Sequence, residues 1–91
     1  MTVLIRLHAT HRCHADGRSS VEVTAGATVG DCLHNLVNLH PDLGPVLFDG
    51  NGNLNKLIEI YLNAKSTYPD ELRKPVRNGD EIHVTRLLAG G

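Results

Sequence analysis

Apolar and polar residues alternate along four short stretches of the chain, residues 2–9, 20–24, 57–63 and 81–85. Alternation of this kind is typical of strands with one buried face, because successive side chains of a strand point to opposite sides. We therefore predict four strands and a core on one side of the sheet. The predicted inward-facing residues are Val3, Ile5, Leu7, Val21, Val23, Ile58, Ile60, Leu62, Ile82 and Val84.

Residues 29–40 have instead the spacing of an amphipathic helix. Thr28 and Asp31 are placed as a capping box would be, and Pro41 should end the helix. A single helix with one apolar stripe, following a pair of strands, packs most simply across one face of a sheet. The stripe comprises Val29, Leu33, Leu36 and Val37, with Cys32 beside them.

The connections carry their own signals. Asp16-Gly17 supplies hairpin-turn chemistry between the first two strands, but the long connection predicts a loose tip. Residues 43–48 should form one turn of helix that closes an end of the core, and residues 49–53 a loop. Residues 64–77 are polar and irregular, with room for a single helical turn between residues 68 and 74.

Asn78-Gly79 is a turn pair that introduces the final strand. The alternation fails at Arg86, where an apolar residue is expected, so the chain should leave the sheet there. Because glycine has no side chain, Gly90 and Gly91 predict a tail over residues 87–91 that is flexible and slender. The reactive group of such a tail would be the terminal carboxylate of Gly91.

Composition limits the classes of protein that fit. The 91 residues predict a single domain, and 41% hydrophobic with 21% charged residues is typical of a globular chain. A net charge of −1 without a basic run argues against nucleic acid as the main partner. The apolar run Val3-Leu4-Ile5 is interrupted by Arg6, so we expect neither a signal peptide nor a membrane segment, and a cytoplasmic location.

Candidate chemistry outside the tail is weak. His8, His11, Cys13 and His14 could bind a metal, but their spacing matches no closed zinc pattern, and we interpret them as a solvated polar turn. A metal-binding module built on His11, Cys13 and His14 stays open as an alternative. His83 is interpreted as a solvated residue on an exposed strand face.

Two further candidates fail on local grounds. Asp49 begins a sequence like that of a calcium loop, but Leu54 and Ile60 occupy the positions that require glycine and glutamate. Cys32 has no base that the sequence pairs with it, so we interpret it as a buried core cysteine. Since the chain also lacks a Ser/His/Asp arrangement, we do not expect it to be an enzyme.

The order of elements, together with three segments, resembles the ubiquitin-like sulfur-carrier family. The segments are Asn-Gly-Asp-Glu-Ile at residues 78–82, Leu-Ala-Gly-Gly at residues 88–91, and Ile-Glu-Ile-Tyr-Leu-Asn at residues 58–63. The family includes the small subunit of molybdopterin synthase and the thiamine-pathway carrier. Residues 55–63 look most like the cysteine-biosynthesis type. The fold implied is the α+β β-grasp, a mixed sheet packed on one main helix.

The resemblance also implies a chemistry. A ubiquitin-activating-type adenylyltransferase would adenylate the Gly91 carboxylate with ATP, and a sulfur donor would then displace AMP to leave a thiocarboxylate for a downstream sulfur-accepting enzyme. No cofactor would be bound stably. Arg86 and the two leucines after it stand where some family tails carry a proline or an aromatic residue. The residues expected to contact the partner are Leu87, Leu88, Ala89, Gly90 and Gly91.

Two alternatives share the same tail. The chain could be the small subunit of a molybdopterin-synthase-like complex, which would purify with its partner, or a ubiquitin-like modifier that forms isopeptide bonds with lysines. The final sulfur acceptor is open, since thiamine, molybdopterin, cysteine, homocysteine and specialised metabolites are all consistent with the same tail.

Overall fold

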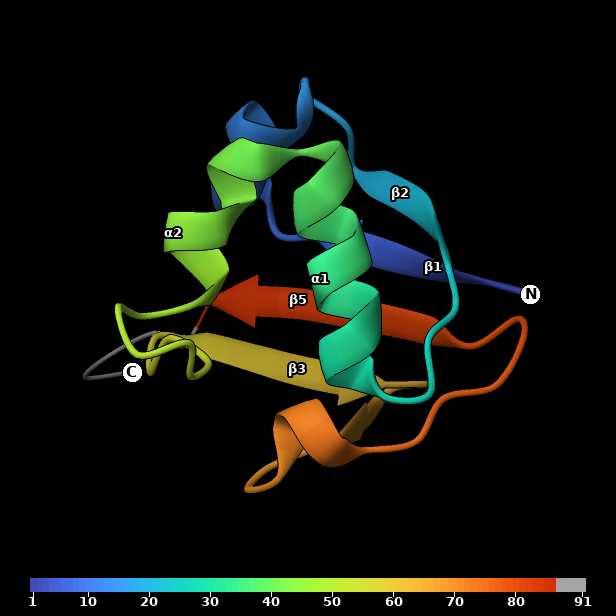
Figure 1. The fold of residues 1–91 in the computed structure, drawn as a ribbon. Coiled ribbons are helices and arrows are strands. Elements are labelled where there is room, and N and C mark those ends of the chain that lie inside the picture. The colour runs from blue at the N-terminus through green and yellow to red at the C-terminus, as the bar shows by residue number, and fades with distance from the viewer. Residues whose placement is uncertain (87–91) are drawn as a thin grey trace.

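The computed structural model describes residues 1–86 of the chain. Five strands form one sheet in the order β2-β1-β5-β3-β4, and the main helix, α1, lies across one face of it (Figure 1). β1 and β5 are parallel neighbours, whereas every other pair is antiparallel. The predicted mixed sheet packed on one helix is confirmed. The strands are β1 Thr2–Leu7, β2 Ser20–Thr24, β3 Ile58–Leu62, β4 Lys65–Ser66 and β5 Glu81–Arg86.

The alternating residues form the core as predicted. Ile5 pairs with Ile82 across the centre of the sheet, and both are inaccessible to solvent. Nine of the ten inward-facing residues are buried, and Leu62 is partly buried against the same cluster. The period of two therefore identified the buried face of all four predicted strands.

The helix α1, Val29–Leu39, ends one residue earlier than predicted. Its capping box is present: the Thr28 hydroxyl accepts from the Asp31 N–H at 3.3 Å, and the Asp31 carboxylate accepts from the Thr28 N–H at 3.3 Å. Both of these N–H groups lack a partner within the helix, and the two side chains supply one for each. The residues that α1 buries are Val29, Gly30, Cys32, Leu33 and Leu36.

The short helices η2, Pro41–Leu43, and α2, Gly44–Leu47, confirm the helical turn predicted after α1. Leu43 and Leu47 are both completely buried, so these two side chains close one end of the core. A two-residue turn with positive φ at Asn63 and Ala64 follows β3. The helical turn expected before Pro75 is η3, Glu71–Arg73.

Two expectations about connections are wrong. The tip of the first hairpin is not loose: residues Ala9–Ala15 form the 3₁₀ helix η1, which His8 caps by accepting the Thr10 N–H, and which buries His11 and Ala15. The connection after β3 is not wholly irregular, because β4 pairs with its end. Buried Thr67 explains this pairing, since its N–H and hydroxyl both donate to the Ile60 carbonyl, at 3.1 and 2.8 Å.

The Asn78-Gly79 turn is confirmed, with a φ of 85° at Gly79. It is tied to the start of β1 twice: the Gly79 N–H donates to the Thr2 carbonyl at 2.8 Å, and the Thr2 N–H donates to the Asn78 side chain at 2.9 Å. These contacts position the start of β5 beside β1.

Replacing Gly30 by alanine should destabilise the protein. A Cβ at Gly30 would lie 2.9 Å from the Leu72 carbonyl oxygen, which belongs to the backbone and cannot rotate away. Alanine is more favourable than glycine in a helix by about 1 kcal/mol, but overpacking costs about 1–3 kcal/mol. We therefore expect the free energy of unfolding, measured in urea, to fall by roughly 1 kcal/mol. In the control, Gly50→Ala, at a loop position where a Cβ would meet nothing within 4 Å, stability should hardly change. A Gly30→Ala protein as stable as the parent would contradict this packing.

Asp80 should make the protein more stable at neutral than at acidic pH. Hydrogen bonds from the Asn63 side chain and the Arg77 N–H hold the pKa of Asp80 below its ordinary value of 3.8. The unfolded state therefore binds the proton more readily, so this stabilisation is fully present above the unfolded pKa and is lost as pH falls through the folded one. The free energy of unfolding, measured in urea between about pH 6 and about pH 2, should depend less steeply on pH in Asp80→Asn than in the parent. The control Asp42→Asn, at an exposed position on η2, should keep the parental dependence; an unchanged slope in Asp80→Asn would contradict the assignment.

Candidate functional site

The predicted partner-binding residues, Leu87, Leu88, Ala89, Gly90 and Gly91, lie outside the described part of the chain. The structure shows where they attach. β5 is the central strand of the sheet, and Arg86 is its last residue. The tail therefore follows the central strand of the sheet.

The end of β5 is held mainly by β3. The pairing with β1 ends at Val84, whose carbonyl accepts the His8 N–H at 3.0 Å, whereas the pairing with β3 continues until Arg86 faces Ile58. The Thr85 hydroxyl adds a hydrogen bond to the Glu59 carbonyl at 3.2 Å. Arg86 itself is exposed.

The sheet face opposite α1 carries a polar network at its centre. One oxygen of Glu81 accepts from Arg6 Nε at 2.6 Å and contacts His83 Nε2 at 2.9 Å. The Arg6 guanidinium, then His83, hold the pKa of Glu81 below its ordinary value. The His83 side chain is thus partly exposed and lies beside Glu81, where the expectation was a solvated residue on an exposed strand face.

The same face continues onto β3, where Tyr61 pairs with His83. The Tyr61 hydroxyl donates to the Glu59 carboxylate at 3.1 Å, and this bond raises the pKa of Tyr61. Arg6 and Tyr61 therefore flank His83 on the two neighbouring strands. This face offers polar side chains of both charges for contact with another protein.

A cavity of about 190 Å³ lies at the base of the tail, a feature that the sequence did not reveal. His11 is 5% exposed in this region, and its Nδ1 atom is buried without a hydrogen-bond partner in the described part of the chain. Burial, first, and then the nearby His8, His14 and Arg86 lower the pKa of His11. The seven lining residues are Thr10, His11, Val46, Asn55, Leu57, Ile58 and Arg86.

The sequence carried no clear signal for this site, because Leu7 ends strand β1 and the following segment forms a 3₁₀ helix that buries His11 and Ala15. The earlier interpretation as a solvated turn is wrong for His11. Within residues 1–86, no group of three His, Cys, Asp or Glu side chains is arranged to hold a metal ion, and Cys13 is exposed.

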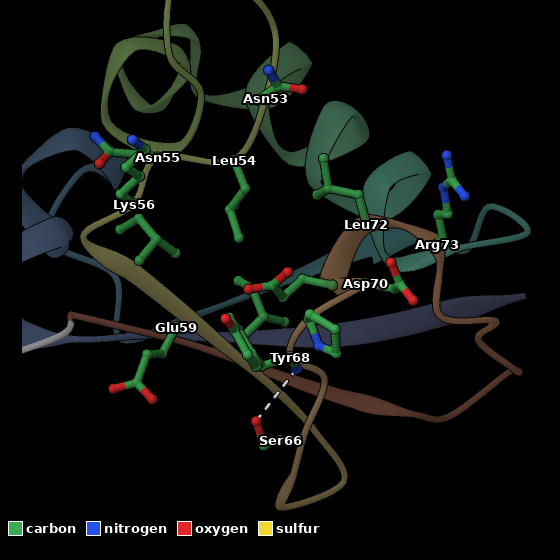
Figure 2. A pocket seen from close by; sticks show the side chains of 14 residues that line it. Asn53, Leu54, Asn55, Lys56, Glu59, Ser66, Tyr68, Asp70, Leu72 and Arg73 are labelled. Atoms are coloured by element: carbon green, nitrogen blue, oxygen red, sulfur yellow. Dashed lines mark hydrogen bonds between the residues drawn. The ribbon is translucent and has the colours of Figure 1, made fainter.

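A larger cavity, of about 650 Å³, opens along β3 on the side of the sheet that carries β4. Figure 2 shows Leu54 pointing into the space between β3 and the segment that carries Tyr68 and Leu72. Its walls combine apolar side chains with Lys56 and Arg73 and with acidic residues. Its described lining residues form no arrangement that assigns a ligand to it.

The remaining sequence candidates have structural roles. Cys32 is inaccessible and accepts a hydrogen bond from the Gly26 N–H at 3.4 Å, and burial raises the pKa of its thiol, which confirms the core cysteine. One oxygen of Asp49 accepts from the N–H groups of Asn51 and Asn53 at 2.8 and 3.0 Å, so this carboxylate shapes the loop. No helix among the first 86 residues has the length and apolar character needed to cross a membrane.

Comparison with known proteins supports the resemblance. A model of the ThiS family matches residues 5–91. Small archaeal modifier protein 1 of Haloferax volcanii is 34% identical over 71 residues, which is 78% of each chain.

Solved structures agree. The crystal structure of SAMP1 from Haloferax volcanii superposes with a TM-score of 0.87 at 30% identity and covers all of both chains. A chain in the crystal structure of the Amycolatopsis orientalis BexX/CysO complex superposes with a TM-score of 0.86 at 27% identity, covering 98% of this chain and 99% of that one. The predicted β-grasp fold is confirmed. The chain belongs to the ThiS family, among the ubiquitin-like small sulfur-carrier and modifier proteins.

Proposed function

We propose that this chain is a sulfur carrier whose Gly91 carboxylate is activated by a partner and converted to a thiocarboxylate. A carboxylate oxygen attacks the α-phosphorus of ATP and pyrophosphate leaves. A sulfur donor then attacks the acyl carbon, the bond to AMP breaks, and the acyl group carries sulfur in place of oxygen. A downstream enzyme consumes that sulfur. The chain itself is the substrate of each step.

The observation that carries the proposal is the extent of the family match, which runs through to Gly91. The likeness to a chain of the BexX/CysO complex adds support, since it spans nearly the whole molecule. Physical chemistry agrees with a glycine end: the carboxylate must lie beside ATP, and a Cβ at Gly90 or Gly91 would restrict extension and crowd a narrow entry.

The proposed partners follow from this chemistry. An ATP-dependent adenylyltransferase would bind Leu87, Leu88 and the glycine end, and the polar sheet face around Glu81 and His83 would contact the same enzyme. Sulfide would supply the sulfur directly. A sulfurtransferase or a desulfurase would supply it as a persulfide, whose attack leaves an acyl disulfide that a thiol then cleaves to the thiocarboxylate. A cytoplasmic location stays a prediction.

A ubiquitin-like modifier is the second candidate, favoured by the 34% identity to small archaeal modifier protein 1. Both candidates require the same activated carboxylate and differ in the nucleophile that follows: a sulfur donor for a carrier, a lysine amine for a modifier. A modifier should form higher-mass conjugates in cell lysate that disappear when Gly91 is deleted, and a carrier should form none.

Intact mass spectrometry after incubation with the activating enzyme, ATP and sulfide should show a gain equal to replacing one oxygen by sulfur, located at Gly91. Replacing Gly90 by alanine should lower the rate of this mass gain at least tenfold, because a small misplacement of a reacting group lowers a reaction rate by roughly that factor or more. The control Gly50→Ala, at a loop position where a Cβ would meet nothing within 4 Å, should react like the parent. An unchanged mass, with no adenylate trapped under active conditions, would refute the proposal.

A further inference from the structure

His11 lines the cavity at the base of the tail. The residue is 95% buried, and its Nδ1 atom is buried without a hydrogen-bond partner among residues 1–86. Buried polar atoms are nearly always paired, because burial removes their hydration. The imidazole lines the cavity together with Arg86, the last residue before the tail. A ligand that pairs with this ring would remove its desolvation penalty.

The electrostatics indicate the sign of that ligand. The rings of His8 and His11 lie 6.0 Å apart, and His8, His14 and Arg86 all disfavour a proton on His11. No acidic residue is among the seven described residues that line the cavity, and the Asp16 carboxylate lies 3.8 Å from His40 Nδ1. The surroundings of His11 are therefore basic, and a negative group in the cavity would be attracted by them and would favour protonation of the ring.

We propose that this cavity binds a single carboxylate group, held between the His11 imidazole and the Arg86 guanidinium. A guanidinium binds a planar carboxylate through two parallel hydrogen bonds, and an imidazole N–H can donate a further bond. The apolar side chains of Val46, Leu57 and Ile58 line the same cavity and suit the methylene groups that precede an acidic group. A volume of about 190 Å³ suits such a side chain better than a nucleotide.

Two sources can supply the carboxylate. One is the Gly91 carboxylate. Gly91 lies five positions after Arg86, and a chain of that length extends to about 17 Å. The carboxylate can therefore reach the cavity beside Arg86, where its effective concentration would be high. The other is an acidic side chain of a partner that binds the tail. The first source rests on the proposed function, which requires a free carboxylate at Gly91, while the binding site itself does not.

The test is an NMR titration of the His11 ring. It compares the chain bearing a free Gly91 carboxylate with the same chain bearing a C-terminal carboxamide. Each is titrated in excess sodium acetate and in sodium chloride of equal ionic strength. In the carboxamide form, acetate should raise the pKa of His11 by about half a unit or more, since a nearby opposite charge shifts a pKa by about one unit or more at full occupancy.

The comparison of the two forms identifies the source. A higher pKa of His11 in the free-carboxylate form without acetate assigns the site to Gly91. Equal pKa values, each raised by acetate, assign it to an external acidic side chain. His34, whose ring contacts the Gly30 carbonyl and stacks on Phe48, is the internal control and should not respond.

The variant Arg86→Gln should lose most of the response to acetate while retaining the fold, because Arg86 is exposed. Equal pKa values of His11 in both forms, unmoved by acetate, would overturn the proposal. The readout involves no sulfur, so a chain that never gains sulfur can still show the shift. Failure of this inference and failure of the carrier function are thus separate results.

Discussion

The parallel pairing of β1 with β5 is the constraint on which the rest of the structure depends. These strands come from the two ends of the described chain, and Ile82 and Val84 of β5 are completely buried between β1, β3 and α1. Parallel neighbours need a long crossover, and here everything from β2 to the Asn78-Gly79 turn provides it. The sheet is therefore complete only when its last strand is in place, and the tail begins where that strand ends.

This arrangement separates a rigid base from the segment that is proposed to react. Thr85 and Arg86 are held against β3, so the position of the last described residue is set by the sheet. The polar network around Glu81 lies on the same strand, and the cavity with His11 lies at its end. A partner that reaches for the tail would thus meet surfaces fixed relative to the point where the tail begins.

The sequence predicted most of the fold because its signals are local. The alternation of Val3, Ile5 and Leu7 and the pairing of Thr28 with Asp31 each depend on neighbouring residues. What it missed depends on contacts that no pattern of apolar and polar residues encodes. η1 buries His11, a polar residue that burial rules place outside, and β4 depends on Thr67 reaching the Ile60 carbonyl. Both cavities lie between separate segments. From the sequence, Gly30 only lowers the helix propensity of its segment, but in the structure the Leu72 carbonyl leaves no room there for a Cβ.

The proposed function requires that a partner enzyme activates the Gly91 carboxylate as an acyl adenylate, a step common to a carrier and a modifier. ATP–pyrophosphate exchange by the activating enzyme tests it most directly. We predict exchange that depends on the added chain and is lost when the same chain bears a C-terminal carboxamide, while its fold and sheet surface stay unchanged. Exchange that the carboxamide form supports equally well, or none with the free carboxylate, would contradict the account.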